Sequence, residues 1–361
     1  MESREGADRF GRVLERKLIA ALVGIPVALV CGAVFGVELE RTSRIPDVLA
    51  APRGHFERTF EVTRFQRGNV HTHTTLSDGS SSPERTILWY RTHGYNFLAL
   101  TDHNILSSRS RYVFFEEPGF TLIPGEEITM RGHGRQVHVN ALCTATRIAG
   151  GDFATASAAL SSAITQVDAQ NGVAIVNHPN FDWALTPADV VGAGAAALLE
   201  IASGHPYVHT AGDVKHPSHE KIWDIALSEG ASFMGVAVDD VHTIDVSHDP
   251  PAIPGRGWVQ VFADHADRTE ICDALRTGRL YATTGAELQA ISVTGEGYRV
   301  TPKDVDATVT FIGASGAELA KIPTHGSDAV YVPRGDEGYV RARVENAGGK
   351  QAWTPAVRVH T

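Results

Sequence analysis

The sequence predicts an α/β fold in which strands and helices alternate and close into a β/α barrel. Three observations indicate this fold. Short apolar runs alternate with amphipathic segments over roughly 200 residues, as in barrel proteins. Polar side chains, many of them histidine, follow one apolar run after another. The 361 residues, 43% of them hydrophobic, can form one large core and a smaller second one.

The predicted elements follow from the spacing of apolar residues. Short runs of apolar residues are typical of strands. We expect strands at 96–100, 136–142, 172–176, 197–201 and 232–238. Helical spacing predicts helices over Pro83–His93, Ala154–Asn171, His219–Glu229 and Thr269–Thr277. After Gly285 the pattern changes to alternating apolar and polar residues with turn signals. We therefore expect a barrel over residues 67–284 and a small all-β, sandwich-like domain over 285–361.

The N-terminal region contains a candidate membrane anchor. Residues 18–37 carry no charge and match the ~20 residues that span a bilayer. Basic residues precede this segment and Glu38 and Glu40 follow it, which places residues 1–17 in the cytoplasm and the catalytic part in the periplasm or outside the cell. A cleaved signal peptide, giving a secreted protein, and a buried helix are the alternatives. Residues 38–66 are interpreted as a linker.

Composition excludes several classes of function. The net charge is −10, with 32 basic and 42 acidic residues, so no nucleic acid is expected as a structural partner. Cys31, Cys143 and Cys272 are too few and too scattered for a disulfide framework, and none belongs to a CxxC motif. Any bound metal must therefore use histidine and carboxylate ligands.

The strongest local signal is His71 and His73 at the end of an apparent strand. Side chains two residues apart lie on the same strand face, so both imidazoles can reach one cation. Alone, such a pair is more often a polar strand end. The pattern recurs, however, at the ends of other strands: Asp102, His103, Glu126, Glu127, His138, His178, Asp240 and His242. Strand ends of a barrel converge on one face, where uncompensated carboxylates and imidazoles would be costly to bury. The sequence therefore predicts a metal centre.

The ordered set HTHTTLSDG, LTDHN, GEE, VHV, NHP and DDVH resembles the PHP (polymerase and histidinol phosphatase) superfamily, over roughly residues 67–281. The resemblance implies a distorted seven-stranded β/α barrel with two or three divalent cations. It places the first cation on His71, His73, Glu127 and Asp240, the second on Glu127, His138 and His178, and the third on Asp78, His103 and His242. The Asp78 position is His in some branches, which leaves the third site in doubt. Asp102 and Asp239 become candidates for orienting ligands or for a structural role. The segments PGRGWVQV, DALRTGRLYATTG and QAWTP resemble the carbaryl-hydrolase-like branch.

This resemblance implies hydrolysis by a metal-bridging water held by Glu127, with Asp240 and His242 adjacent. Such a site accepts Mn, Zn or Fe. Arg256, beside two glycines, is the candidate for binding a small-molecule substrate. The leading hypothesis is a phosphoesterase acting on a small phosphomonoester or nucleotide, and the second is a carbamate or carboxylic ester hydrolase. A third is a membrane-tethered binding protein without activity, which the presence of all nine candidate ligands argues against.

Overall fold

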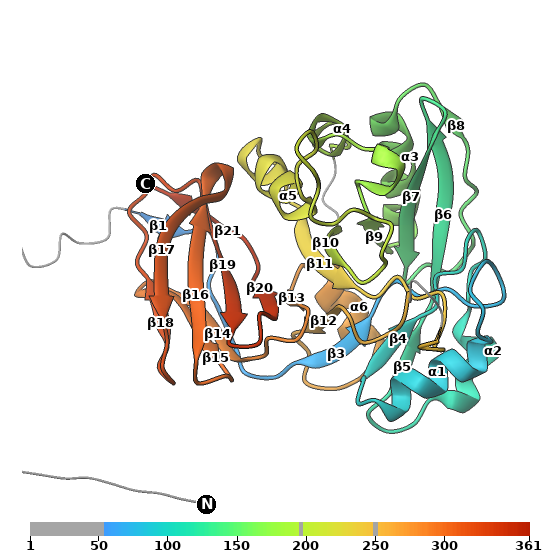
Figure 1. Cartoon of the computed structure of the whole chain (residues 1–361), viewed down its shortest axis with the longest axis horizontal. Helices are drawn as coiled ribbons and strands as arrows, with labels where there is room; N and C mark the ends of the chain where they lie inside the picture. Colours follow the sequence, from blue (N-terminus) through green and yellow to red (C-terminus); the bar gives the residue numbers. More distant parts are fainter. Residues whose placement is uncertain (1–53, 195–197, 248–251) are drawn as a thin grey trace, which may run out of the picture. The chain divides into compact units, whose positions relative to one another are not determined.

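The computed structural model describes residues 54–194, 198–247 and 252–361, which belong to one compact unit (Figure 1). The predicted cytoplasmic segment 1–17 and membrane anchor 18–37 lie outside the described residues. Within the described ranges, none of the helices is both long enough and apolar enough to span a bilayer.

The part of the chain that carries the predicted ligands is a mixed α/β fold built on two groups of strands. The first group comprises the parallel strands β3 (Gln66–Asn69), β4 (Phe97–Ala99) and β5 (Thr121–Ile123), with β12 (Trp258–Val261) antiparallel beside β3. The second is a six-stranded sheet in the order β11 (Met234–Val238), β10 (Leu198–Ser203), β9 (Val173–Val176), β7 (Arg135–Leu142), β6 (Gly125–Gly132) and β8 (Asp152–Phe153). In it β7 runs antiparallel to both neighbours.

The described hydrogen bonds do not close these strands into the single seven-stranded barrel expected from the sequence. The two groups meet through isolated bridges: Thr72 with Val241, His103 with Glu127, and Ser107 with Gly125. Pro124, which has no N–H to donate, separates β5 from β6. The first two bridges lie at or next to candidate ligands, where the two sheets approach without a continuous ladder.

The four predicted helices are present as α1 (Pro83–Thr92), α3 (Ala156–Asp168), α5 (His219–Ser228) and α6 (Arg268–Arg276). Each begins after a side chain that accepts a hydrogen bond from a backbone N–H of the first turn: Ser82, Thr155, Ser218 and Asp267. The shorter helices α2 (Arg109–Tyr112) and α4 (Pro187–Gly192) lie in connecting segments. The apolar face of α3 packs against β6, β7 and β9 and buries Leu160 and Ile164 completely.

The C-terminal region is all β, in two sheets that share one apolar core. One sheet contains β18 (Ala329–Tyr331), β15 (Gly297–Pro302), β14 (Leu288–Thr294) and β2 (Phe60–Val62). The other contains β1 (His55–Phe56), β16 (Ala307–Gly313), β17 (Ala317–Pro323), β19 (Tyr339–Asn346), β20 (Gln351–Trp353) and β21 (Val357–His360). This second sheet continues into the mixed α/β part, because β20 pairs with β13 (Leu280–Thr283). The boundary predicted at residue 285 is a turn between strands and not a break in the sheet.

The predicted linker is wrong for residues 54–66. Strand β1 pairs with β21, and β2 pairs with β14, so this stretch belongs to the C-terminal sheets. Phe56 is buried, and its ring meets the edge of Tyr298 with the ring centres 6.0 Å apart. The charged residues between the apolar ones hid this pattern in the sequence, and the partner strands lie more than 200 residues away.

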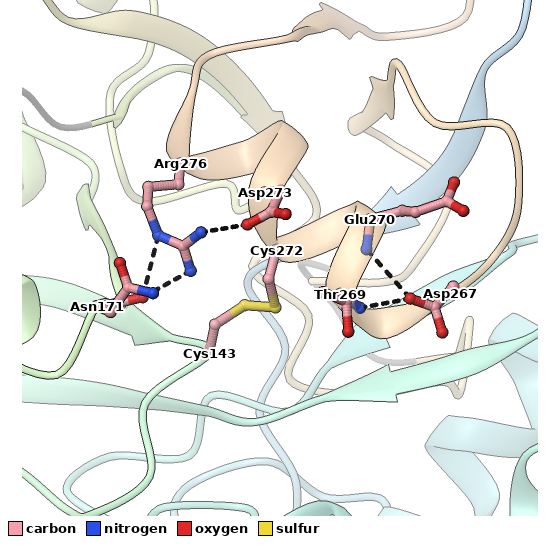
Figure 2. The surroundings of a disulfide bond; sticks show 8 residues. All are labelled: Cys143, Asn171, Asp267, Thr269, Glu270, Cys272, Asp273 and Arg276. Carbon is pink, nitrogen blue, oxygen red and sulfur yellow. Dashed lines mark hydrogen bonds and ion pairs between the residues drawn. A yellow bond between two sulfur atoms is a disulfide. The ribbon is translucent and has the colours of Figure 1, made fainter.

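A disulfide joins Cys143, just after β7, to Cys272 in α6 (Figure 2). Their Cα atoms lie 6.1 Å apart, a normal separation for a disulfide. Beside the disulfide, the Arg276 guanidinium donates to the backbone carbonyl of Asn171. The sequence predicts no disulfide framework, and it does not predict this single bond. The fold brings together cysteines that no local motif connects.

Candidate metal centre

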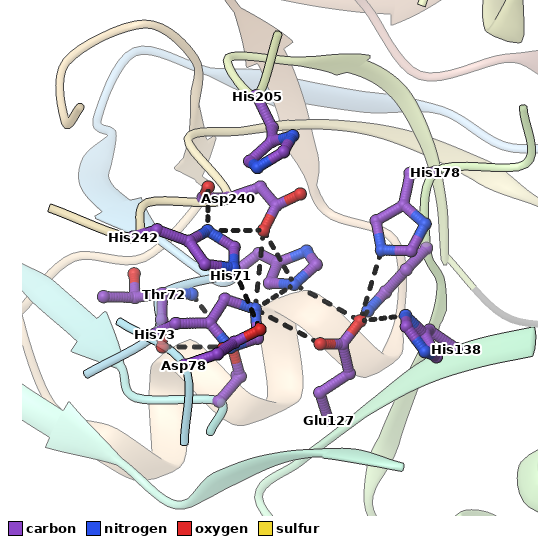
Figure 3. A network of polar contacts seen from close by, with 12 residues as sticks. His71, Thr72, His73, Asp78, Glu127, His138, His178, His205, Asp240 and His242 are labelled. Atoms are coloured by element: carbon purple, nitrogen blue, oxygen red, sulfur yellow. Dashed lines mark hydrogen bonds and ion pairs between the residues drawn. The ribbon is translucent and has the colours of Figure 1, made fainter. Parts of the chain in front are cut away.

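The structure brings all nine predicted ligands into one cluster at the ends of the strands. His71 and His73 follow β3, His103 follows β4, and Glu127 lies in β6 near the junction of the two sheets. The remaining members come from β7, from the segments after β9 and β11, and from the loop after His73: His138, His178, Asp240, His242 and Asp78. Figure 3 shows most of these side chains directed toward a common centre.

Glu127 is the central residue of the cluster. Its carboxylate is buried, and each oxygen faces a different set of imidazoles. Oε1 lies 3.4 Å from His71 Nε2, 3.2 Å from His138 Nδ1 and 3.3 Å from His178 Nε2. Oε2 lies 3.2 Å from His73 Nε2 and 3.1 Å from His103 Nδ1. This arrangement suits a carboxylate that bridges two cations with one oxygen each.

His71, His73 and Asp240 form a second compact group. The two Nε2 atoms lie 3.0 Å apart, and each is 3.4 Å from Asp240 Oδ1. Asp240 has a φ of 50°, in the left-handed region that residues other than glycine seldom adopt. Such strain is typical of functional sites, where surrounding contacts hold a side chain in one position.

Asp78 completes the cluster on its exposed side. Its carboxylate is 53% exposed, and Oδ2 lies 3.5 Å from both His103 Nε2 and His242 Nε2. Oδ1 lies 3.3 Å from His73 Nδ1, so His73 contacts Glu127 through one ring nitrogen and Asp78 through the other. Among the described residues, four sets have the spacing of a metal site: His71–His73–Asp240, His71–Glu127–His178, His73–His103–Glu127 and His73–Asp78–His242. His73 occurs in three of these sets, whereas the sequence analysis assigned it to one cation only.

The chemistry of the donor set fits divalent cations. Burial alone would raise the pKa of Glu127, but the surrounding imidazoles of His138, His71 and His178 outweigh it and hold that pKa well below its ordinary value. Burial likewise opposes protonation of His71, yet Asp240 and Glu127 raise its pKa well above 6.5. The cluster thus attracts positive charge into a buried site. Neither ring nitrogen of His138 makes a hydrogen bond, although Nδ1 is close to Glu127, so this imidazole has a free lone pair for a metal.

Glu200 is a site residue that the sequence analysis missed. It is fully buried in β10, and its Oε1 lies 2.6 Å from His71 Nδ1. Its Oε2 accepts a hydrogen bond of 2.8 Å from the backbone N–H of His178. The only sequence signal is a carboxylate inside the apolar run ALLEI. Asn177 was missed as well, and its Nδ2 donates to Glu127 Oε1 at 2.7 Å.

Of the two roles considered for Asp102 and Asp239, their hydrogen bonds fit the structural one. Asp102 accepts hydrogen bonds from the backbone N–H and the hydroxyl of Thr74, which fixes the loop between His73 and Asp78. Asp239 accepts from the phenol of Tyr90 at 2.7 Å and from the backbone N–H of Arg256 at 2.6 Å. The Arg256 side chain is exposed, so it is accessible to an anionic ligand.

His205, in the loop after β10, lies beside the cluster and belongs to none of the four sets found among the described residues. Its ring centre is 4.9 Å from that of His242, and Figure 3 shows it on the same side as Asp240. Burial, together with the positive charge of His242 and neighbouring histidines, lowers the pKa of His205 to about 4 against the opposing effect of Asp240.

Comparison with known proteins gives distant matches. No protein-family model matches the chain. A 5'-3' exoribonuclease from Haemophilus influenzae is 35% identical over 72 residues, which cover 20% of this chain and 26% of the exoribonuclease. The chain thus spans about a quarter of the relative that it matches.

Solved structures with a similar outline are also distant. A two-domain protein containing a predicted PHP-like metal-dependent phosphoesterase from Bacteroides vulgatus is 18% identical, with a TM-score of 0.44 over 81% of this chain and 92% of that one. An amidohydrolase from Chromobacterium violaceum is 14% identical, with a TM-score of 0.35 over 49% of this chain and 87% of that one. Likenesses of this degree do not establish a family.

Proposed function

We propose that this protein is a metal-dependent hydrolase, and specifically a phosphoesterase of the PHP superfamily that acts on a small phosphomonoester or nucleotide. The observation that carries the proposal is the buried Glu127 carboxylate, whose two oxygens face two separate sets of imidazoles. A pair of cations supplies a water of lowered pKa and polarises the oxygen that gains negative charge.

The chain's own residues hold and orient this centre. His71, His73, Asp240 and Glu127 would hold one cation, and Glu127, His138 and His178 a second. Asp78, His103 and His242 would hold a third, with His73 also within reach. Glu200 keeps the proton of His71 on Nδ1, which leaves Nε2 free to face the cluster. Arg256 would bind an anionic group of the substrate at the exposed side.

The preference for phosphorus over an acyl carbon is supported by two features. The short match to an exoribonuclease connects the chain to a protein named for cleaving phosphodiesters. The exposed Arg256 provides a cation for phosphate. The finer assignment to the carbaryl-hydrolase-like branch rests on the downstream segments alone, and a carbamate or carboxylic ester is the competing substrate class.

We also propose that the N-terminal segment 18–37 anchors the protein in a membrane, with the catalytic part in the periplasm or outside the cell. The Cys143–Cys272 disulfide supports this location, because disulfides form and persist in oxidising compartments. Protease treatment of cells with a permeabilised outer envelope and an intact inner membrane tests the topology: the catalytic part should be digested, whereas protection would place it in the cytoplasm.

The experiment that tests the activity compares three substrates on the full-length chain loaded with Mn or Zn. These are p-nitrophenyl phosphate, p-nitrophenyl acetate and a naphthyl carbamate, with His71→Ala as the variant that loses a ligand and His325→Ala as the matched control. His325 is an exposed histidine remote in sequence from the cluster. Turnover of the phosphate, lost only in His71→Ala, supports the phosphoesterase. Turnover of the ester or carbamate alone selects the competing class, and inactivity on all three despite bound metal contradicts the proposal.

A further inference from the structure

The loop that follows β10 places one more histidine at the metal centre, in a manner unlike the ligands. His205 is half-buried and has ring contacts with His242 and Tyr207. Its ring centre lies 4.9 Å from that of His242, and the two planes meet at 61°, edge to face. The chain therefore has an imidazole beside the cluster that none of the candidate cations requires.

Hydrogen bonds within the loop fix the position and the tautomer of this ring. The backbone N–H of Tyr207 donates to His205 Nδ1 at 3.3 Å. A nitrogen that accepts cannot carry a proton, so the proton of the neutral ring is on Nε2. The two ring nitrogens point in different directions, and Nδ1 faces its own loop. Nε2–H is therefore the group left to donate elsewhere.

The start of the loop is held by close packing. The backbone N–H of Gly204 donates to the carbonyl of Val238 at 2.9 Å. A Cβ at Gly204 would lie 2.5 Å from Arg256 Cβ and 2.9 Å from the carbonyl oxygen of Asp239, so only glycine fits there. The backbone of Arg256 is in turn fixed by the Asp239 carboxylate. His205 is thus delivered from a rigid turn, next to the residue proposed to bind an anion.

We propose that His205 Nε2–H donates a hydrogen bond to an oxygen of the substrate's phosphoryl group, which makes His205 a substrate-binding residue and not a metal ligand. This inference rests on the proposed function and names a contact of that same site. The hydrogen bond holds the phosphoryl group both in the bound substrate and in the transition state, so its loss should lower kcat/KM. Removing a single donor to a reacting oxygen typically lowers the rate by about 10²–10³-fold.

The test uses the full-length chain loaded with Mn and p-nitrophenyl phosphate as substrate. His205→Ala is expected to lower kcat/KM by about 10²–10³-fold with unchanged Mn content. His205→Gln, whose amide nitrogen reaches the Nε2 position, should recover at least part of the loss, whereas His205→Asn, which reaches only the Nδ1 position, should not. His209→Ala in the same loop is the matched control. His209 is exposed and stacks on Trp183, away from the ligands.

Two results would overturn the inference. Loss of Mn from His205→Ala would make His205 a ligand, and full activity of that variant would show that the ring does not contact the substrate. Binding of inorganic phosphate to the Mn-loaded protein gives a readout without turnover. We expect His205→Ala to weaken it by about tenfold, as for one lost hydrogen bond to a charged group. If the wild-type protein binds Mn and hydrolyses none of the esters, the proposed function fails. The phosphate-binding measurement still tests His205 separately, because equal phosphate affinities of the wild type and His205→Ala would refute its role.

Discussion

His71 Nδ1 lies 2.6 Å from Glu200 Oε1, and both side chains are completely buried. The carboxylate can only accept, so the imidazole donates from Nδ1, which leaves Nε2 as the nitrogen that faces the candidate metal centre. Glu200 also accepts from the backbone N–H of His178, so one carboxylate positions two candidate ligands. The site therefore depends on a residue that contacts no cation.

Glu200→Gln should weaken metal binding although it removes no ligand. The amide keeps the shape of the side chain but loses the charge that favours the Nδ1–H tautomer of His71. We expect Mn affinity to fall by about 10–100-fold, the usual effect of losing such a partner. Isothermal titration of the chelator-treated protein measures this change. Glu318→Gln, on the exposed face of β17, is the matched control, and equal affinities for the two variants would contradict the role of Glu200.

Metal affinity should increase with pH. The pKa values of His71 and His73 are raised above 6.5 because Asp240 and Glu127 outweigh the effect of burial. Each ring therefore keeps its proton to a higher pH than an ordinary histidine does, and a cation must displace that proton. Between about pH 6 and pH 8, affinity should increase by about tenfold per pH unit for each proton released. Mn titrations at several pH values, with proton release followed in weak buffer, test this. A pH-independent affinity would mean that the rings are neutral before metal binds.

Removing the buried arginine of β19 should destabilise the whole described unit. Arg341 is fully buried and donates to both carboxylate oxygens of Asp224 in α5 at 2.8 Å. Arg341→Ala leaves the Asp224 charge buried without its partner, which typically costs about 3–5 kcal/mol. Urea unfolding measures the loss. Arg343→Ala, which removes a more exposed guanidinium 3.1 Å from Glu220, is the control and should cost at most about 1 kcal/mol. Similar losses for both variants would show that burial of the pair is not decisive.

The Cys143–Cys272 disulfide should be required for full stability. It links residues 129 positions apart, and replacing both cysteines by alanine should lower the free energy of unfolding by about 2–4 kcal/mol. The stabilities of Cys31→Ala and of the variant with all three cysteines replaced by alanine should be compared. These two proteins differ only in the cysteines of the disulfide, so the difference measures the effect of that bond. Thiol titration of the unfolded, unreduced wild-type protein should find one free thiol. Three free thiols in protein recovered from its native compartment would contradict the disulfide.

Local pattern was sufficient to predict much of the fold and most of the cluster. The four long helices follow from apolar spacing and from capping residues such as Thr155 and Asp267, which act within one turn. His71, Glu127 and Asp240 could be found because each ends or follows an apolar strand. The features that the local sequence pattern could not predict depend on contacts with residues far along the chain. Nothing near Glu200 in sequence shows that it faces His71.

The pairing of β1 with β21 has a consequence for how the protein folds. His55 pairs with His360, so this ladder can form only after a loop of about 300 residues has closed. Contacts this remote contribute late, and they slow folding relative to a chain built from local hairpins. While the ladder is incomplete, β14 has an unpaired edge where β2 will add, and exposed edges invite association between chains. We therefore expect refolding yield to fall steeply with protein concentration.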